Sequence, residues 1–420
     1  MNMNREDLYY VLFEQQKDFY DGSYVPREII PEVLSLLKLN LPLIITGVRR
    51  AGKSTLLKLV REKLQLTTKE CLYINFNDER LINFSIEDFQ KILDFLTEHK
   101  YKENCVLFID EIQEVSHWEK WVDRIKEHHS LLITGSNSKL LSKEISTILT
   151  GRSVNLGLYP FSFREYLTFH KMGTTNINID LKLQAKIRQM FLDYLTLGGI
   201  PQVIVNNEDR ILLEIYENIL YRDIIKRFNR NLEKPIKEMS LYLLSNISKE
   251  VSIRSLSKLL GVSNLSTVKS ILENFEKSFL FFSVSKFDYS LKKQIQNPHK
   301  IYCIDNGFVT KGGFQFSENK GRLLENLIFL ELKRRNLDIY YFSGKRECDF
   351  VIRDKAKISQ VIQICFNLNE ENKERELSGL KEAMDKFKLK EGLIITANQD
   401  EVFKDLGIKI LPAWKWLLQK

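Results

Sequence analysis

Short apolar runs alternate with amphipathic stretches near the start of the chain. Five of these runs have the length and composition of buried strands, at residues 43–46, 72–76, 106–110, 131–134 and 154–158. The intervening stretches carry apolar residues at helical spacing. Strands that alternate with helices predict a parallel sheet covered by helices on both faces. The pattern therefore predicts an α/β domain over residues 1–165.

The strands then disappear and return further along the chain. Residues 166–240 have a helical pattern, which predicts a helical lid or connector, and residues 241–300 predict a compact helical unit with a hairpin. Strands are expected again at residues 301–304, 339–342, 349–352, 361–366, 393–396 and 408–412, and helices at 318–335 and 370–387. This second alternation predicts another α/β domain over residues 301–420.

Composition narrows the class of protein. Of the 420 residues, 44% are hydrophobic, but no apolar run approaches the roughly 20 residues that a membrane helix needs. The first residues lack the apolar centre of a signal peptide. The five cysteines are widely spaced, as in reduced intracellular thiols. We therefore expect a cytoplasmic protein without a membrane partner. The net charge of +8 is compatible with nucleic acid as a partner and does not require it.

A glycine-rich segment joins the first expected strand to a helical pattern and matches G-x-x-x-x-G-K-[ST]. The predicted nucleotide-binding residues are Gly47, Arg50, Ala51, Gly52, Lys53, Ser54 and Thr55. In such a loop the backbone amides surround the β-phosphate, and the helix N-terminus adds its positive end. Lys53 would neutralise the β- and γ-phosphates, and the Ser54 hydroxyl would ligate Mg²⁺. The motif predicts ATP and Mg²⁺ as cofactors.

A second acidic signal follows the strand at residues 106–110. That apolar run ends in Asp110 and Glu111. Asp110 would hold Mg²⁺ through its water shell, and Glu111 would act as the general base on the attacking water. An acidic pair at a strand end is also a frequent helix N-cap, and the buried strand before it favours the catalytic interpretation.

Two further residues complete the predicted catalytic set. Asn137 or Ser136, after the strand at residues 131–134, would lie between the γ-phosphate and the water; the alternative is a helix cap. Arg152 would meet the nucleotide of a neighbouring subunit and stabilise the transferring phosphoryl group; the alternative is a surface arginine. An arginine acting in this way predicts self-association into a ring, for instance a hexamer.

The motifs at residues 46–55, 72–78, 108–113, 132–138 and 151–166 together resemble the archaeal and bacterial AAA-superfamily ATPases. The resemblance implies an AAA+-type core. The rest of the chain resembles the domain of unknown function that commonly follows this ATPase, on residues 198–201, 221–224 and 321–326. Residues 25–28 fit the family's entry to the nucleotide site, which implies a position near adenine.

Residues 253–273 predict a helix-turn-helix. An amphipathic helix ends at Gly261, and a second helix with a polar N-terminal half follows. The apolar run and the lysines after it predict the wing of a winged helix. The candidate DNA-binding residues are Asn264, Ser266, Thr267, Lys269, Lys292 and Lys293. The two wing lysines would contact phosphates, which position a protein without reading sequence. A winged helix can also serve only to pack against protein.

The C-terminal domain has the layout of a restriction-endonuclease-like PD-(D/E)XK nuclease fold. A helix carries Glu325, a strand carries Asp349, and the next strand carries Gln363 and Cys365 where the motif has Glu and Lys. An amide is a poor substitute for a carboxylate ligand, and a thiol cannot replace the ammonium. The sequence predicts a nuclease-like domain that does not cleave, with a divergent magnesium-dependent nuclease as the alternative.

These features lead to one principal functional hypothesis and two alternatives. The principal one is an ATP-hydrolysing motor or remodeller that binds duplex or branched DNA and works as a ring. The first alternative is a regulatory or signalling NTPase whose C-terminal half binds protein or controls transcription. The second alternative is the divergent nuclease. DNA-stimulated ATP hydrolysis separates the first hypothesis from the others.

Overall fold

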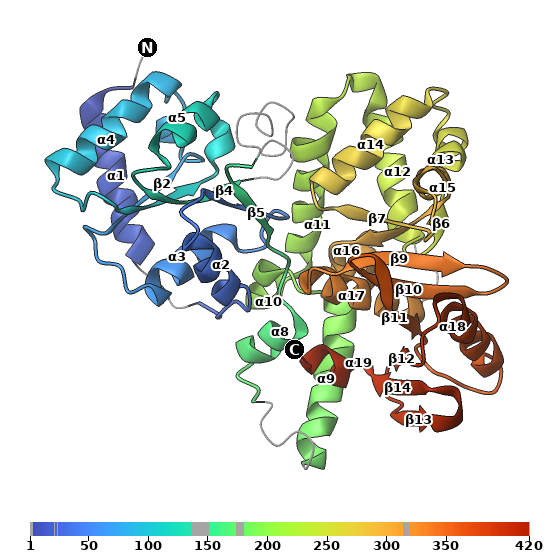
Figure 1. Ribbon diagram of the computed structural model, residues 1–420. Helices are drawn as coiled ribbons and strands as arrows, with labels where there is room; N and C mark the ends of the chain where they lie inside the picture. Colours follow the sequence, from blue (N-terminus) through green and yellow to red (C-terminus); the bar gives the residue numbers. More distant parts are fainter. Residues whose placement is uncertain are drawn as a thin grey trace. The chain divides into compact units, whose positions relative to one another are not determined.

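The computed structural model describes residues 3–20, 22, 24–135, 151–173, 180–313 and 319–419. The chain divides into two compact units, Met1–Tyr159 and Pro160–Lys420 (Figure 1). Within the described ranges, no helix is long and apolar enough to cross a membrane.

A five-stranded parallel sheet forms the centre of the first unit. Its strands are β1 (Leu43–Thr46), β2 (Cys71–Asn75), β3 (Val106–Asp110), β4 (Ser130–Gly135) and β5 (Val154–Gly157), in the order β2-β3-β4-β1-β5. Every neighbouring pair is parallel. The parallel α/β sheet expected from the sequence is confirmed, with each predicted strand within about a residue of its position.

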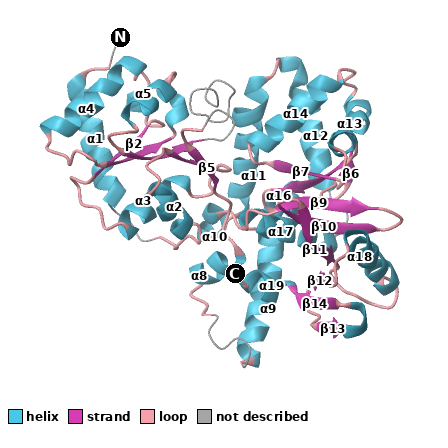
Figure 2. Ribbon diagram, in the orientation of Figure 1, coloured by secondary structure: helices cyan, strands magenta, loops and turns pink. Residues whose placement is uncertain are grey.

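Helices cover both faces of this sheet, as Figure 2 shows. They are α1 (Arg5–Tyr20), α2 (Ile30–Leu37), α3 (Lys53–Lys63), α4 (Phe89–Glu98) and α5 (Trp118–Ile125). Side chains of α1, α4 and α5 form one core with alternate strand residues such as Ile44 and Ile133. Helices α2 and α3 lie on the opposite face. Because both faces are covered, β1 is buried along its whole length.

Helix α1 lies along the edge strand β2 and bonds its backbone. Gln16 exchanges two hydrogen bonds with Tyr73: its Nε2 donates to the carbonyl at 2.6 Å, and its Oε1 accepts from the amide at 3.1 Å. Gln15 does the same for Asn75, at 3.2 and 2.9 Å. These amide side chains take the place of a neighbouring strand, so the edge of the sheet is closed.

The second unit begins with helices: α8 (Phe163–Phe169), α9 (Leu181–Leu197), α10 (Pro201–Asn206), α11 (Asp209–Asn218) and α12 (Glu233–Ser245). A three-stranded antiparallel sheet follows, in the order β6-β8-β7, from β6 (Glu250–Val251), β7 (Phe281–Ser285) and β8 (His299–Cys303). Helices α13 (Ile253–Leu260) and α14 (Leu265–Lys277) lie between β6 and β7 in the chain, and α15 (Leu291–Gln296) lies between β7 and β8.

A six-stranded mixed sheet completes the second unit, in the order β13-β14-β12-β11-β10-β9. Its strands are β9 (Asp338–Ser343), β10 (Glu347–Asp354), β11 (Lys357–Ile364), β12 (Gly392–Thr396), β13 (Glu401–Phe403) and β14 (Ile408–Pro412). Strands β9, β10 and β11 form an antiparallel meander, and β11, β12 and β14 run parallel. The accompanying helices are α16 (Asn306–Gly312), α17 (Lys320–Arg334), α18 (Lys373–Phe387) and α19 (Ala413–Leu418).

The three domain boundaries expected from the sequence all fall inside regular elements. The boundary after residue 165 lies within α8, the one after 240 within α12, and the one after 300 within β8. The small sheet also joins the large one, because the Phe287 amide donates to the Tyr341 carbonyl of β9 at 2.8 Å. Because a helix or strand continues across each of these three positions, the sequence there is not that of a polar or glycine-rich linker.

A buried polar network explains two of the family motifs. The Asp305 carboxylate accepts hydrogen bonds from the amides of Gly199 (2.6 Å) and Gly307 (2.8 Å). A Cβ at Gly198, whose φ is +82°, would lie 1.8 Å from Asp305 Oδ1. Asn326, from the motif at residues 321–326, accepts a hydrogen bond from the Cys303 amide and donates one to the Cys303 carbonyl. These motif residues therefore hold α9, β8 and α17 together.

Candidate nucleotide-binding site

The loop between β1 and α3 has the geometry of a phosphate-binding loop. Gly52 is the N-cap of α3 with φ +94°, a conformation that glycine adopts without steric cost. A Cβ at Gly47 would lie 2.3 Å from the carbonyl oxygen of Leu158, so a side chain does not fit there. Both glycines of the motif are thus required by the backbone, and the loop opens directly onto a helix N-terminus.

Lys53 and Ser54 are the first two residues of α3. Lys53 is buried, and its Nζ lies 3.0 Å from the Gly47 carbonyl oxygen and 3.3 Å from that of Val48. The ammonium is therefore held against the loop. Ser54 is exposed, and its hydroxyl is close enough to the carboxylate of Asp110, at the end of β3, to favour the ionised form of that group. The structure thus brings together the two predicted metal ligands, which are separated by the whole of β2.

Asp110 is the most constrained carboxylate of this site. It is 1% exposed, and it accepts hydrogen bonds from Tyr73 Oη at 3.0 Å and from Thr134 Oγ1. Burial raises the pKa of Asp110, the charge of Glu111 raises it further, and the three hydroxyl donors oppose this rise. A nearby cation would favour the ionised form. Sequence reasoning missed Tyr73, in the middle of β2, and Thr134, near the end of β4, although both strands are neighbours of β3.

The donor set fits Mg²⁺. A carboxylate and a hydroxyl are hard oxygen donors, and Mg²⁺ in phosphate sites takes one or two protein ligands and completes its shell with water and phosphate oxygens. Within the described part of the chain, no group of three or more acidic, histidine or cysteine side chains forms a metal cage. Asp110 and Ser54 therefore suit a metal that arrives with a nucleotide.

Glu111 follows Asp110 in a left-handed conformation, with φ +52°. Its amide hydrogen-bonds Thr134 Oγ1 at 3.3 Å, and its carboxylate accepts from Gln113 Nε2. A non-glycine residue in this conformation costs free energy, which the surrounding contacts must offset. The strained backbone turns the Glu111 side chain away from the direction that a continued strand would give it.

The Arg27 side chain supports the phosphate loop through hydrogen bonds to backbone carbonyls. Its guanidinium donates to the carbonyl of Ala51 at 2.8 Å and to that of Tyr159 at 2.7 Å. The side chain is buried, at 7% exposed. The sequence placed residues 25–28 at the entry to the nucleotide site, and the structure adds a specific contact between Arg27 and the loop backbone.

Arg152 lies at the opposite edge of the sheet from the loop. Strand β5 pairs with β1 so that Val154 faces Leu43 and Gly157 faces Thr46, which places Arg152 before the amino end of β5. Its guanidinium is 59% exposed and lies 3.4 Å from Asp123 Oδ1. Arg152 therefore cannot reach the phosphate loop of its own chain. Asn137 and Ser136 lie outside the described residues.

The predicted DNA-binding residues of the second unit lie on two helices. Asn264 is the N-cap of α14 and accepts from the Ser266 amide at 2.9 Å. Lys269, one turn further, is exposed and lies 3.9 Å from Glu273. The expected extended wing is wrong in one respect: Lys292 and Lys293 lie on the short helix α15. Five of the six residues of this segment are leucine, lysine or glutamine, which are good helix formers. Thr267 lies in the first turn of α14.

Three acidic residues of the second unit surround a lysine that was not among the predicted site residues. Lys300 of β8 is 2% exposed, and its Nζ lies 3.0 Å from Glu325, 2.9 Å from Asp349 and 2.5 Å from Glu347. Burial lowers the pKa of Lys300, but the carboxylates raise it well above its usual value. An ammonium is therefore the cation of this cluster.

The two substituted motif positions lie beside that cluster. Gln363, near the end of β11, donates to Glu376 at 2.7 Å and accepts from the Asp349 amide at 3.3 Å. Cys365 was expected within a strand but follows the end of β11, buried with its thiol on the Asn367 carbonyl. Burial raises the pKa of Glu325 to about 8, and the charge of Asp349 adds to the rise.

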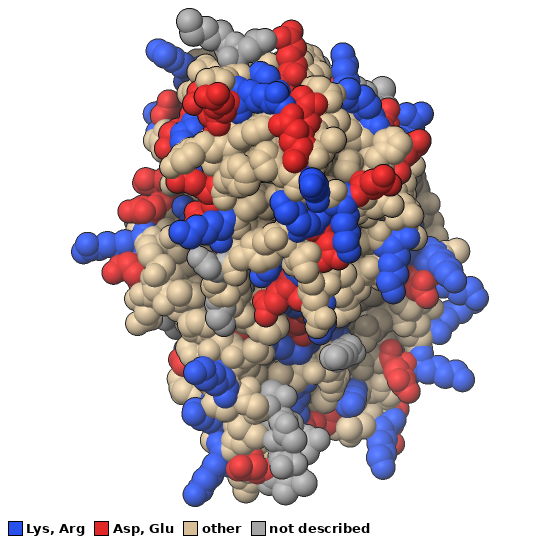
Figure 3. Space-filling model, turned by 90° about the vertical axis from the view of Figure 1, so that its left-hand side faces the viewer, with Lys and Arg blue, Asp and Glu red and all other residues tan. Residues whose placement is uncertain are grey.

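Basic and acidic side chains are interspersed over the face that Figure 3 shows, without a continuous field of one sign. The net charge of +8 is thus not gathered on that face. A polyanion that binds this face would contact local clusters of lysine and arginine.

Comparisons with known proteins cover nearly the whole chain. The family described as "AAA domain" matches residues 40–167. Two domains of unknown function, DUF8612 and DUF4143, match residues 188–312 and 320–416. Uncharacterized protein MJ1544 of Methanocaldococcus jannaschii is 35% identical over 89% of this chain and 88% of its own. An uncharacterized protein of Haemophilus influenzae is 30% identical over 90% and 94%.

Solved structures match at low identity. The Thermotoga maritima RuvB Holliday junction branch migration motor is 16% identical, with 63% of this chain and 92% of that chain covered and a TM-score of 0.33. At that TM-score the likeness says nothing about function. The match to MJ1544 covers 89% of this chain and therefore extends over both units. The chain therefore belongs to the same family as MJ1544, and its first unit, with the match to the AAA domain, is an ATPase domain.

Proposed function

We propose that the first unit hydrolyses ATP at the β1–α3 loop and that the second unit applies this cycle to DNA. The observation that supports the site most directly is the proximity of the Ser54 hydroxyl to the Asp110 carboxylate. It joins the first turn of the helix after the loop to the end of β3. A magnesium ion bound there would neutralise charge on the phosphates.

Each residue has a distinct role in this proposal. Lys53 leaves the carbonyls of Gly47 and Val48 and pairs with the β- and γ-phosphates, which are far better partners for an ammonium. Glu111 orients the attacking water and accepts its proton. Asn137 holds the γ-phosphate and the water in line. Arg152 acts on the nucleotide of a neighbouring subunit, in a ring, because its own loop is at the other edge of the sheet.

The nucleic-acid part of the proposal is supported by the order of elements around α14. Helix α12, strand β6, helices α13 and α14, and strands β7 and β8 follow one another as in a winged helix, with the sheet order β6-β8-β7. Gly261 ends α13 with φ +64°, and Asn264 begins α14. The N-terminal turn of α14 carries exposed polar side chains, as a helix that enters a major groove requires.

The C-terminal sheet is proposed to bind DNA without cleaving it. The order of α17, β9, β10, β11, α18 and β12 is that of a PD-(D/E)XK nuclease-like domain, but Lys300 pairs with both acids that would ligate a metal. A divergent nuclease remains the alternative, and it predicts magnesium-dependent cleavage that Asp349→Ala abolishes.

An ATPase assay of the full chain with single-stranded, duplex and branched DNA in parallel tests this proposal. A DNA-acting motor should hydrolyse ATP faster with at least one of the three. A rate that none of them changes would favour the regulatory NTPase, in which nucleotide state controls a protein-binding second unit. A protein that stays monomeric with ATP and DNA would contradict the ring.

A further inference from the structure

A pocket of about 620 Å³ opens on the second unit. It lies outside the helix pair, α13 and α14, and outside the acidic cluster around Lys300. Three segments line it: residues 287–294 after β7, the β10–β11 hairpin, and the end of α18 with the turn that follows. The volume lies in the range of roughly 300–1,000 Å³ that small-molecule sites occupy. The pocket therefore admits a group of nucleotide size but not a base-paired duplex.

Positive charge dominates the lining of this pocket. The cations are Arg353, Lys357, Lys386 and Lys388, and the one carboxylate among the lining residues is Asp288. Arg353 pairs with Asp338, its Nε 2.7 Å from Oδ2. Asp288 lies 3.9 Å from Lys293. The three lysines are exposed and form no ion pair with any residue that the structure describes.

Ordinary helix electrostatics explains only part of this charge. Lys386 and Lys388 lie at the C-terminus of α18, where cations interact favourably with the last carbonyls. Lys357 and Arg353 come from a β-hairpin and have no such reason to be there. Two separate elements thus direct cations at one pocket, which favours an anionic ligand.

Three aromatic rings are among the residues that line the pocket. Phe287 packs edge-to-face on Phe387, with ring centroids 5.1 Å apart, and on Tyr289 at 5.3 Å. The Phe287 amide donates a hydrogen bond to the Tyr341 carbonyl, which fixes the backbone that carries the ring. Tyr289 is 79% exposed. An aromatic ring that is held in place but left open to solvent adds little to folding and is suited to stack on a ligand.

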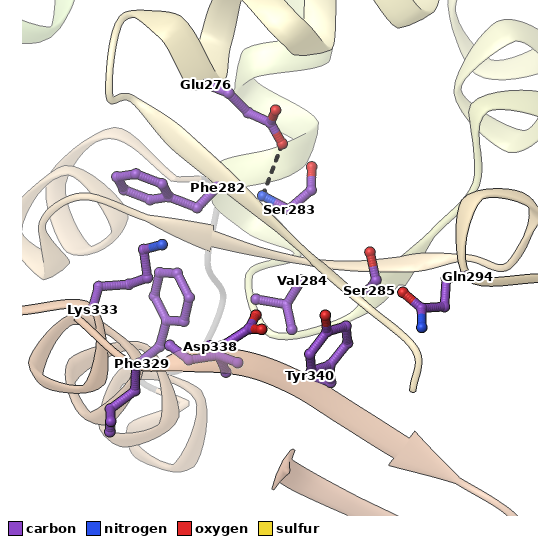
Figure 4. A pocket seen from close by; sticks show the side chains of 12 residues that line it. Glu276, Phe282, Ser283, Val284, Ser285, Gln294, Phe329, Lys333, Asp338 and Tyr340 are labelled. Carbon is purple, nitrogen blue, oxygen red and sulfur yellow. Dashed lines mark hydrogen bonds between the residues drawn. The ribbon is translucent and has the colours of Figure 1, made fainter. Parts of the chain in front are cut away.

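A neighbouring pocket of about 400 Å³ provides a contrast (Figure 4). It also has aromatic walls, Phe329 and Tyr340, but its charged side chains are Glu276, Asp338 and Lys333. The Glu276 carboxylate accepts from the Ser283 amide at 3.0 Å. With two carboxylates against one ammonium, this neighbouring pocket is not suited to a phosphate.

We propose that the pocket beside Tyr289 binds an unpaired segment of single-stranded nucleic acid, with a base stacked on Tyr289 and phosphates on Lys357, Lys386 and Lys388. Cations that follow the backbone and aromatic rings that stack on bases are the two components of sequence-independent single-strand binding. A duplex keeps its bases stacked inside and cannot offer one to Tyr289. This inference rests on the proposed nucleic-acid role of the second unit and names the form of nucleic acid bound.

Fluorescence anisotropy of the full chain with labelled oligothymidine, oligouridine and a blunt duplex tests this proposal. Tyr289→Ala should weaken binding of the single strands at least about fivefold, the lower end of what one base–aromatic stack contributes. Tyr289→Phe, which keeps the ring, should bind like the wild type. Tyr10→Ala, an exposed tyrosine of α1 (61% exposed), is the matched control and should change nothing.

Salt dependence tests the lysines. Replacing Lys357 and Lys388 by glutamine should reduce the slope of log affinity against log salt by about 1.4, since each single-strand phosphate contact contributes roughly 0.7. A preference for oligothymidine or oligouridine identifies DNA or RNA as the source of the strand, and equal binding supports single-stranded nucleic acid in general. Equal single-strand affinity of wild type and Tyr289→Ala would overturn the proposal.

The helix pair is tested separately in the same assay. Lys269→Ala on α14 should weaken duplex binding and leave oligothymidine binding unchanged. A wild-type protein that binds single strands but no duplex would contradict the role proposed for α13 and α14 and leave the proposal for the pocket standing. Loss of single-strand binding alone would do the reverse.

Discussion

The Ser54 hydroxyl on α3 lies beside the Asp110 carboxylate at the end of β3 and favours its ionised form. These two residues lie 56 positions apart in the sequence (110 − 54). The parallel sheet brings them together because the carboxyl ends of its strands share one edge. The candidate phosphate loop, the carboxylate of Asp110 and the adjacent Glu111 are thus assembled at this edge.

Removing the support of the phosphate loop should weaken nucleotide binding. Arg27→Gln loses the charged hydrogen bonds to the Ala51 and Tyr159 carbonyls. Two such bonds stabilise the loop by about 1–3 kcal/mol, so the Kd for ATP should rise roughly tenfold. Titration with a fluorescent ATP analogue measures the change.

The matched control for that variant is Arg5→Gln. Arg5 is an exposed arginine of the same unit, and it pairs with Glu98 away from the loop. Nucleotide affinity should stay unchanged in the control. An Arg27→Gln protein with the affinity of the wild type would show that the guanidinium does not order the loop.

The ring arrangement predicts complementation between two inactive variants. Arg152→Ala keeps its phosphate loop but lacks the arginine, and Lys53→Ala keeps the arginine but lacks a working loop. Each alone should hydrolyse ATP at least about a hundredfold more slowly than the wild type. Mixed subunits place an intact loop next to an intact Arg152, so ATP turnover by the mixture should recover. A mixture no more active than its parts would contradict a shared site.

Lys300 should stabilise the second unit strongly. Lys300→Met leaves the carboxylates of Glu325 and Asp349 buried without their cation, which costs about 3–5 kcal/mol of unfolding free energy. Urea denaturation followed by tryptophan fluorescence measures this loss. Lys292→Met removes an exposed lysine of α15 and should change stability by less than about 0.5 kcal/mol. Equal stability of the two variants would refute the assigned role of Lys300.

Asp305 should make stability depend on pH. Burial raises the pKa of Asp305 to about 6 from an ordinary value of 3.8, so the folded protein binds its proton more tightly than the unfolded chain does. The resulting stabilisation is complete below about pH 4 and is lost as the pH rises through about 6. The shift corresponds to about 3 kcal/mol.

Other groups titrate in the same range, so the measured quantity is the difference between wild type and Asp305→Asn. The unfolding free energy of the wild type, minus that of the variant, should fall between pH 4 and 7 and stay level above 7. A difference that stays constant across this range would show that Asp305 has an ordinary pKa in the folded protein.

The prediction of the nucleotide site rests on local patterns in the sequence. The loop motif places seven consecutive or near-consecutive residues, and the strand before Asp110 is a continuous apolar run. Lys300 could not be predicted, because its partners Glu325 and Asp349 lie 25 and 49 residues away on other elements. Nothing in the sequence around a lysine in an apolar strand indicates which carboxylates it will meet.

The expected domain boundaries fall inside regular elements. Sequence boundaries are visible when linkers are polar or rich in glycine and proline. Here α8, α12 and β8 continue across the expected positions, and β8 contributes Lys300 to a cluster formed with the following domain. Lys300 of the small sheet pairs with Asp349 of the large sheet, so the two sheets of the second unit are in direct contact.

ATP turnover and ATP binding, measured together on wild type, Lys53→Ala and Glu111→Gln, test the central claim most directly. The account predicts magnesium-dependent turnover by the wild type and loss of binding in Lys53→Ala. It predicts retained binding in Glu111→Gln with turnover at least about a hundredfold slower, the lower end of a general base's contribution. Undiminished turnover in Glu111→Gln, or wild-type protein that binds no ATP, would contradict it.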